Sequence, residues 1–352
     1  MIIPGSGVPA VMRAAFLLAP GEVEVREVPV PRPGRGEVLV GVEAALTCGT
    51  DLKMYRRGHA RLPLPAPFGH EFAGRVVVTG EGVREFTPGD AVMCVPTAPC
   101  GACRLCEAGR ENLCPQAVGR MVLGAYADYV LLPEHIVERH LFQRPPSLTP
   151  EAAAMLEPLA CVVHGASRVA WPRVRHAVIL GDGAIALLFA RMAVLRNVPR
   201  VLVLGRHETR LVVARQYGAE AAIASDDDAA RDLVGEFTTG AGADLVVECV
   251  GTPETWRLAS ELACTGGVAL LFGGCAASAR VDFDAGRLHY DEIDLIGAFH
   301  YTPRAVQQAV ALLADGTVDA SPLITHRVPL ERLDDALALM NDRSAIRVAL
   351  TP

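Results

Sequence analysis

Four cysteines within fifteen residues are the feature that most constrains the fold of this chain. Cys100, Cys103, Cys106 and Cys114 are separated by two, two and seven residues in the segment CGACRLCEAGRENLC. This spacing lets one short loop place four thiolates around a single tetrahedral zinc ion. Disulfide pairing is the alternative, but the chain does not start with the charged and then apolar segment of a secretory signal. The sequence therefore predicts a structural zinc site.

The composition is typical of a cytoplasmic protein with two domains. The six other cysteines are scattered in mostly apolar surroundings, as free cysteines are in a reducing cell. Hydrophobic residues make up 51% of the 352 residues, which is enough for two cores. Gly, Arg or His interrupts every apolar stretch before the ~18 residues that a membrane span needs. The formal net charge of -7 disfavours a nucleic-acid partner, so we expect neither a membrane nor a nucleic acid as partner.

The pattern of the chain changes near residue 150. The first 150 residues are rich in Gly and Pro and carry short β-type runs separated by turns, which predicts a small β-barrel. A helix is then predicted, with Thr149 as N-cap, Pro150 in its first position and Glu151 near its positive end. From about residue 175 to 300, near-continuous apolar strands alternate with helices. This alternation predicts a parallel sheet covered by helices on both faces.

A glycine-rich turn follows the first of these strands. The apolar strand HAVIL runs directly into the sequence GDGAIA. Gly181 permits a tight turn, Gly183 lets the backbone approach a pyrophosphate, and Ala186 is small enough for close helix packing. Because the turn lies between a predicted strand and a predicted helix, the pyrophosphate would rest on the helix N-terminus. A tight turn without a ligand is the alternative interpretation.

A second set of metal-ligand residues precedes this turn. It comprises Cys48 in the motif CGTD, His70 and Glu71 in GHE, and Glu157 in the predicted helix. Thiolate, imidazole and carboxylate are the ligands of a catalytic zinc, which keeps an open position for water or substrate. The alternative is structural, because a single buried Cys or His usually packs in a core and Glu157 suits a solvated helix face.

The motifs CGTD, GHE, the cysteine segment, EPL and GDGAIA occur in an order that resembles the zinc-dependent medium-chain dehydrogenases. The resemblance is nearest to the polyol, threonine and aminocyclitol dehydrogenases and spans nearly the whole chain. It implies an α/β fold: a GroES-like β-barrel catalytic domain at residues 1–152, a Rossmann nucleotide-binding domain at 153–298, and a return to the catalytic domain at 299–352. It also implies a homodimer or homotetramer that interconverts a secondary alcohol and its ketone by hydride transfer.

The resemblance further implies the ligands of the catalytic zinc. Cys48, His70 and Glu157 would hold the ion, with Glu71 either a direct ligand or exchanging with water. In polyol-type relatives Glu71 is the ligand and Glu157 acts through water, so the two arrangements stay open. Asp51 would accept a hydrogen bond from His70 and fix its tautomer.

Two residues are implied to handle the substrate proton, while zinc acts as a Lewis acid on the hydroxyl. Thr50 would pass the proton outward. Lys53 stands where close relatives often carry a relay histidine, which departs from the threonine dehydrogenase pattern. An ammonium is a poor proton acceptor unless burial lowers its pKa. Lys53 therefore either hydrogen-bonds substrate hydroxyls or the nicotinamide ribose, or it is a solvated surface lysine.

Cofactor choice depends on the end of the second strand of the nucleotide domain, where NAD-specific members carry an acidic residue. In the segment RVLVLGRHETRL that place falls on Gly205, and Arg206 follows it. The missing carboxylate removes a repulsion, and the guanidinium supplies a bidentate partner for a 2′-phosphate. Arg210 would add to this positive field. The sequence thus favours NADP over NAD.

Two other functions are compatible with parts of the sequence. A zinc-free quinone or enone reductase of the same superfamily would share the nucleotide domain, but it would not need Cys48, His70 and Glu157. A non-catalytic protein that binds the nucleotide without turnover is also possible on this fold.

Overall fold

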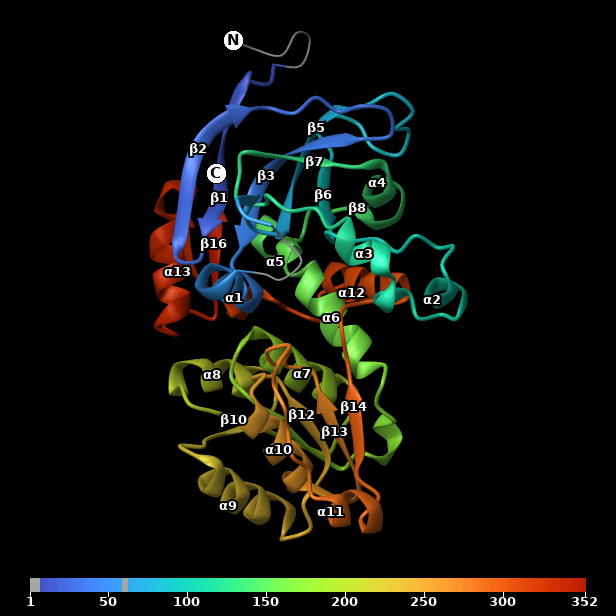
Figure 1. The fold of residues 1–352 in the computed structure, drawn as a ribbon, viewed down its shortest axis with the longest axis vertical. Helices are drawn as coiled ribbons and strands as arrows, with labels where there is room; N and C mark the ends of the chain where they lie inside the picture. The colour runs from blue at the N-terminus through green and yellow to red at the C-terminus, as the bar shows by residue number, and fades with distance from the viewer. Residues whose placement is uncertain (1–6, 59–62) are drawn as a thin grey trace. The chain divides into compact units, whose positions relative to one another are not determined.

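The computed structural model describes residues 7–58 and 63–352, and the chain divides into two compact units. The first unit comprises Met1–Ala160 and Thr302–Pro352, and the second comprises Cys161–Tyr301. Figure 1 shows the course of the chain through both units. Among the described residues, no helix is long and apolar enough to cross a membrane.

Two β-sheets form the framework of the first unit. The larger has the strand order β15-β16-β3-β5-β6-β8, with β7 also paired to β3, and the smaller has the order β2-β1-β4. Neighbouring strands are antiparallel except β15 and β16. The strands are β1 (Val11–Ala19), β2 (Glu22–Pro29), β3 (Val38–Leu46), β4 (Ala66–Pro67), β5 (Glu71–Thr79), β6 (Ala91–Cys94), β7 (Tyr129–Leu132), β8 (Leu141–Gln143), β15 (Ile324–Pro329) and β16 (Arg347–Thr351).

The C-terminal segment completes the larger sheet. Strand β16 pairs with the end of β3, where Ala349 lies opposite Leu46 and Leu350 opposite Ala45. Apolar side chains of β16 join those of β3 and β5 in one core. The last strand therefore runs beside the end of β3, where α1 (Gly49–Arg57) and the motif CGTD follow.

The remaining helices of the first unit are short. They are α2 (Arg104–Glu107), α3 (Pro115–Gly119), α4 (Glu134–His140), α5 (Pro150–Ala154), α12 (Pro303–Ala314) and α13 (Leu333–Asn341), with α6 (Leu156–Ala166) continuing into the second unit.

The helix predicted after Thr149 is present, but it is divided in two. The Thr149 hydroxyl accepts a hydrogen bond from the Ala152 backbone at 3.2 Å, as expected for an N-cap. Helix α5 then ends at Ala154 and α6 begins at Leu156. Pro158 accounts for the break, because its ring would clash with the carbonyl of Ala154 in a continuous helix.

A six-stranded sheet forms the centre of the second unit (Figure 1). Its order is β11-β10-β9-β12-β13-β14, and every pair is parallel, which confirms the predicted sheet. The order reverses beside β9, so a crevice for a ligand is expected at the carboxyl end of that strand. The strands are β9 (His176–Leu180), β10 (Arg200–Gly205), β11 (Glu220–Ile223), β12 (Ala243–Glu248), β13 (Ala263–Leu271) and β14 (Asp294–Gly297).

Helices connect these strands and cover the sheet. Helices α9 and α10 pack on one face, where Val234 and Leu258 join a core with Val178 and Leu180 of β9. Helix α7 packs against β9 and β10, and α8 packs against α7, β10 and β11. The helices are α7 (Ala184–Leu195), α8 (Glu208–Gln216), α9 (Asp227–Thr238), α10 (Pro253–Leu262) and α11 (Ala285–Tyr290).

Candidate functional site

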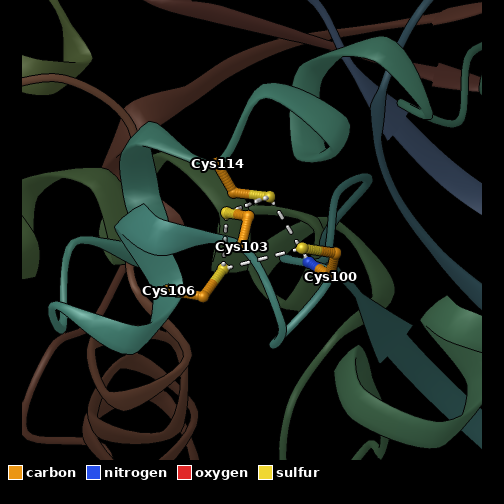
Figure 2. Close-up of side chains that lie close together, drawn as sticks. All are labelled: Cys100, Cys103, Cys106 and Cys114. Atoms are coloured by element: carbon orange, nitrogen blue, oxygen red, sulfur yellow. Dashed lines mark hydrogen bonds between the residues drawn. The ribbon is translucent and has the colours of Figure 1, made fainter.

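The four clustered cysteines point toward one another (Figure 2). Their sulfur atoms are 3.5 Å apart for Cys103 and Cys106, and 3.9 Å apart both for Cys100 and Cys106 and for Cys103 and Cys114. Thiolates at about 2.3 Å from a tetrahedral zinc lie about 3.8 Å apart. All ten cysteines are free, so the structure does not contain the alternative disulfides. The loop has the geometry of a structural zinc site.

The electrostatics of this loop also fit a bound cation. Burial raises the pKa of Cys106 to about 12. Burial acts in the same direction at Cys114, but backbone N–H groups, among them that of Cys100, outweigh it and lower the pKa to about 6. Four neighbouring thiolates repel one another, so a divalent cation is needed before all of them can ionise at neutral pH.

A second group of ligand side chains lies in the first unit between β3 and β5. Cys48 precedes α1, and His70 and Glu71 stand at the start of β5. The ligand atoms of these three buried residues lie within 4.8 Å of one another, with His70 Nε2 3.5 Å from Cys48 Sγ. Burial raises the pKa of Cys48 to about 11 and that of Glu71 to about 8. Acidic donors that resist ionisation in a protein interior suit a metal site, where the ion supplies the missing charge.

Asp51 connects this group to the rest of the unit. Its Oδ2 accepts hydrogen bonds from the Cys48 backbone at 2.9 Å and from the Tyr126 hydroxyl at 2.5 Å, and its Oδ1 lies 3.1 Å from His70 Nδ1. Burial would raise the pKa of Asp51, but the charge and hydrogen bond of His70 outweigh it and lower that pKa. The carboxylate favours the tautomer of His70 with the proton on Nδ1, which leaves Nε2 for a metal.

Tyr126 is a residue of this site that the sequence did not indicate, and its hydroxyl donates a hydrogen bond to Asp51. Its ring packs edge-on against Phe68 with centroids 5.2 Å apart, and it is almost fully buried. Gly69 lies against the same ring in a left-handed conformation with φ of +86°, and an added Cβ would come 2.5 Å from Tyr126 Cδ1. The glycine before His70 is therefore needed for both the backbone turn and the contact with Tyr126. In the sequence, nothing distinguishes Tyr126 from an ordinary core aromatic residue.

Arg347 is a second residue that the sequence analysis missed. It is the first residue of β16, and its side chain is only 4% exposed. Its guanidinium donates a hydrogen bond to the Thr47 carbonyl at 2.6 Å and lies 3.2 Å from Glu71 Oε2. Arg347 lowers the pKa of Glu71 and so opposes the effect of burial. The available signal was a single charge inside the apolar segment AIRVAL, which is unusual for a buried strand.

The structure separates the other predicted residues from this group. Glu157 is half-buried on α6 and lies outside the cluster of three ligands among the described residues, although its charge raises the pKa of Glu71. Thr50 and Lys53 are exposed on α1. The roles of all three remain predictions.

The glycine-rich turn connects β9 to α7. Gly181 adopts a left-handed conformation with φ of +117°, and an added Cβ would come 3.3 Å from Val250. Gly183 is the N-cap of α7, and a Cβ there would meet nothing within 4 Å. Ala186 is buried on the first turn of this helix. The turn therefore leaves the helix N-terminus open to a pyrophosphate.

The predicted cofactor residues at the end of β10 lie beside this turn. Gly205 is buried, Arg206 is exposed, and Arg210 on α8 is nearly buried. Asp182 of the turn accepts a hydrogen bond from the Arg206 backbone at 2.8 Å and pairs with Arg210 at 3.2 Å. Burial alone would raise the pKa of Asp182. The hydrogen bonds from the Arg206 backbone and from His207, together with the charge of Arg210, outweigh burial, and the net pKa is lowered. The sequence analysis overlooked Asp182, which occupies a variable position of the motif.

Two family profiles match this arrangement. The profile described as "Alcohol dehydrogenase GroES-like domain" matches residues 34–140, and that described as "Zinc-binding dehydrogenase" matches residues 184–315. Together they cover more than half of the chain. The chain belongs to the zinc-dependent medium-chain dehydrogenases. The predicted fold class, a GroES-like domain with a Rossmann domain, is confirmed, and the protein is a zinc- and NAD(P)-dependent oxidoreductase that acts on a small-molecule alcohol.

Similar proteins include dehydrogenases of several alcohols. A sorbitol dehydrogenase of Halalkalibacterium halodurans is 32% identical over 94% of this chain and 96% of its own length. An L-threonine 3-dehydrogenase of Bacillus velezensis is 30% identical over 93% of this chain and 95% of its own. A solved structure of a zinc-binding dehydrogenase from Sinorhizobium meliloti bound to NADP has a TM-score of 0.87 and 32% identity, covering 98% of this chain and 100% of that one.

The two cysteine sites should respond differently to substitution. Cys100→Ser should lower the midpoint of thermal unfolding, because a structural zinc contributes directly to the stability of the fold. Cys48→Ser should lower turnover by about a hundredfold or more and change that midpoint little. Metal analysis should find one zinc fewer per chain in each variant. Near-normal turnover of Cys48→Ser at reduced zinc content would refute the catalytic assignment.

Removal of the Arg347 side chain should lower the free energy of unfolding far more than removal of a surface arginine from the same sheet. Arg347→Met leaves the buried Glu71 without its ion-pair partner, a change that typically costs about 3–5 kcal/mol of unfolding free energy. Arg327→Met is the matched control, because Arg327 pairs with Glu151 at 2.9 Å while 60% exposed, and such pairs contribute up to about 1 kcal/mol. Denaturant unfolding measures both, and equal losses would contradict the structural role of Arg347.

Proposed function

We propose that this protein is an NADP-preferring zinc dehydrogenase that oxidises a secondary hydroxyl of a polyol or a related polyhydroxylated alcohol and reduces the corresponding ketone. The observation that carries the proposal is the buried group of Cys48, His70 and Glu71, joined by Asp51. The nucleotide preference rests on a separate observation, the absence of an acidic residue at the end of β10, where Gly205 and Arg206 stand.

Cys48, His70 and Glu71 would hold the catalytic zinc, which supplies Lewis-acid activation of the substrate hydroxyl. Asp51 keeps the Nδ1 proton on His70, so that Nε2 faces the metal position. Thr50 would relay the hydroxyl proton: its oxygen accepts that proton while its own hydroxyl proton passes to solvent, to which Thr50 is exposed. Glu157 either completes the ligand set or acts through water. For hydride transfer itself, the task of the protein is to hold the substrate carbon against the nicotinamide ring.

A polyol substrate is supported by the residues around α1 and by the relatives. Lys53 offers three hydrogen-bond donors that suit a molecule with several hydroxyls. The similar protein from Halalkalibacterium halodurans is named a sorbitol dehydrogenase. The threonine dehydrogenase relative is a less suitable guide, because Lys53 replaces the relay histidine that resemblance to that group implies.

A zinc-free quinone or enone reductase is the main rival function. That function gives no reason for three buried metal-ligand residues, two of which, Cys48 and Glu71, resist ionisation without a cation. Elemental analysis separates the two proposals, because the zinc dehydrogenase should contain about two zinc ions per chain, whereas a reductase without catalytic zinc should contain at most the one of the cysteine loop.

The test of the proposed function is a panel of polyols, cyclitols, sugars, simple secondary alcohols and L-threonine, each assayed by nicotinamide absorbance with NADP and with NAD. We expect the highest kcat/KM for a polyol or cyclitol with NADP. Chelation of the zinc should abolish this activity. Turnover restricted to quinones or enones and insensitive to chelation would overturn the proposal.

Arg206 should be the principal source of the NADP preference. A charge-assisted bond to the 2′-phosphate contributes about 1.5–3 kcal/mol, so Arg206→Ala should lower the ratio of kcat/KM for NADP to that for NAD about tenfold to a hundredfold. Arg215→Ala on the following helix, α8, is the control, because Arg215 is already paired with Glu208. A wild-type enzyme that favours NAD, or an unaltered ratio in Arg206→Ala, would refute the assignment.

Lys53 should contribute to the reaction although it is exposed. Lys53→Ala should lower kcat/KM about tenfold or more through loss of a charged hydrogen bond or a proton relay. Lys53→Arg distinguishes the two roles, because arginine retains the donors but stays protonated at all relevant pH values. Rescue by arginine indicates hydrogen bonding, and failure of rescue indicates proton transfer. Unchanged kinetics of Lys53→Ala across the pH range would show that Lys53 is a solvated surface residue without a role in the reaction.

We also propose that the protein is a cytoplasmic homodimer or homotetramer. Ten free cysteines suit a reducing compartment. Strand β14 is at the edge of the six-stranded sheet, and such an edge can pair with the same strand of a second copy.

A further inference from the structure

Helix α1 carries only basic charges on its exposed side. Its exposed charged residues are Lys53, Arg56 and Arg57. The chain has a formal net charge of -7, yet no acidic residue follows Asp51 in this helix. Asp51 itself is buried, and its carboxylate accepts a hydrogen bond from the Cys48 backbone at 2.9 Å. Helix α1 therefore presents a positive surface on an acidic protein.

These cations follow the helix away from the metal-ligand group. Cys48 is the N-cap of α1, and Thr50 is in its first turn. Thr50, Lys53 and Arg57 are three and four residues apart, so they form one row along the exposed side of the helix. A rise of about 1.5 Å per residue places the Cα of Arg57 about 10 Å beyond that of Thr50. A substrate that starts at the metal position and extends along α1 meets Lys53 first and Arg57 at its far end.

The segments beside α1 leave the guanidinium of Arg57 available. Helix α13 packs against α1, and the turn between β1 and β2 is joined to it by a hydrogen bond from the Gly21 N–H to the Tyr55 carbonyl at 2.6 Å. Arg57 makes no hydrogen bond or ion pair with any residue in 7–58 or 63–352. The neighbouring Arg56 donates to a neutral group, the Asn341 side-chain oxygen, at 3.1 Å.

The acidic residues of these two segments do not pair with Arg57. Two of them have partners of their own, because Asp335 pairs with Arg332 and the Asp342 carboxylate accepts a hydrogen bond from the Ser344 N–H at 2.9 Å. The others are exposed, and in the described part of the chain neither forms an ion pair with Arg57; they are Glu22 and Asp334.

A structural role is the alternative for the two arginines. Cations in the last turn of a helix interact favourably with its terminal carbonyl groups. That effect accounts for Arg56 and Arg57 at the end of α1, but Lys53 lies in the middle of the helix and is not explained by it. A role in stability alone also predicts no discrimination between neutral and anionic ligands, so the two roles can be separated.

We propose that the substrate carries an oxyanion, a phosphate ester or a carboxylate, at the end remote from the oxidised hydroxyl, and that Arg57 binds this group. A guanidinium matches both anions, because its planar N–H groups can donate two parallel hydrogen bonds to their oxygens. Lys53, one turn nearer the metal position, donates to the hydroxyls between. The inference rests on the proposed polyol dehydrogenase function and narrows its substrate class to acidic polyols.

The test measures the dissociation constants of sorbitol, sorbitol 6-phosphate and gluconate for the zinc-loaded enzyme by calorimetry. At least one anionic probe should bind about tenfold or more tightly than sorbitol, and added salt should weaken that probe more than sorbitol. Arg57→Gln should lower the ratio of the two dissociation constants about tenfold, and Arg57→Lys should restore part of it, because lysine keeps the charge but not the paired donors. The anion with the larger Arg57-dependent ratio identifies the group as phosphate or carboxylate.

Arg84→Gln is the control, because Arg84 is an exposed arginine of the same unit in the loop between β5 and β6, and it should leave the ratio unchanged. A wild-type ratio near one, an unaltered ratio in Arg57→Gln, or binding of neither anionic probe would overturn the inference. A lower midpoint of thermal unfolding in Arg57→Gln at an unaltered ratio would assign Arg57 the structural role instead.

The proposed function and this inference can fail separately. Oxidation of sorbitol with no preference for an anionic probe leaves the polyol dehydrogenase function standing and refutes the anionic substrate. Arg57-dependent binding of an anionic probe supports the oxyanion site even if neither NADP nor NAD is reduced, and that second result counts against the proposed reaction.

Discussion

The buried carboxylate of Asp51 is the constraint on which the catalytic site depends. It binds the N-terminus of α1 through the Cys48 backbone, strand β5 through His70, and the segment before β7 through Tyr126. A fully buried carboxylate without partners would destabilise the folded state by several kcal/mol. These three segments must therefore assemble together, and their assembly places Cys48 and His70 side by side.

A second requirement is the return of the chain to the first unit. Arg347 and Thr47 are 300 residues apart in sequence, yet they are joined by a hydrogen bond beside Glu71. The pairing of β16 with β3 brings them together. Arg347 lies against Glu71 only when the last strand is in place, so the environment of this ligand and the closure of the β-sheet are coupled.

The parts of the site that could be predicted from the sequence are those formed within one short segment. One loop supplies all four thiolates of Cys100 to Cys114, and one turn supplies the glycines of GDGAIA. The geometry of each of these two sites could therefore be predicted from the residue spacing alone. Tyr126 and Arg347 could not be recognised, since their roles arise from contacts across 75 and 300 residues. The prediction of a single helix after Thr149 was wrong for a different reason: the ring of Pro158 is incompatible with a continuous helix through the preceding turn, so α5 ends at Ala154.

The two units use the same physical device at the start of a helix. Asp51 lies in the first turn of α1 and Asp182 lies just before α7, and each accepts backbone and side-chain hydrogen bonds from a neighbouring segment. In both places a short acidic side chain sets the position of residues that would contact a ligand. Residues that share such a carboxylate are not independent, so the effects of substituting them are not additive.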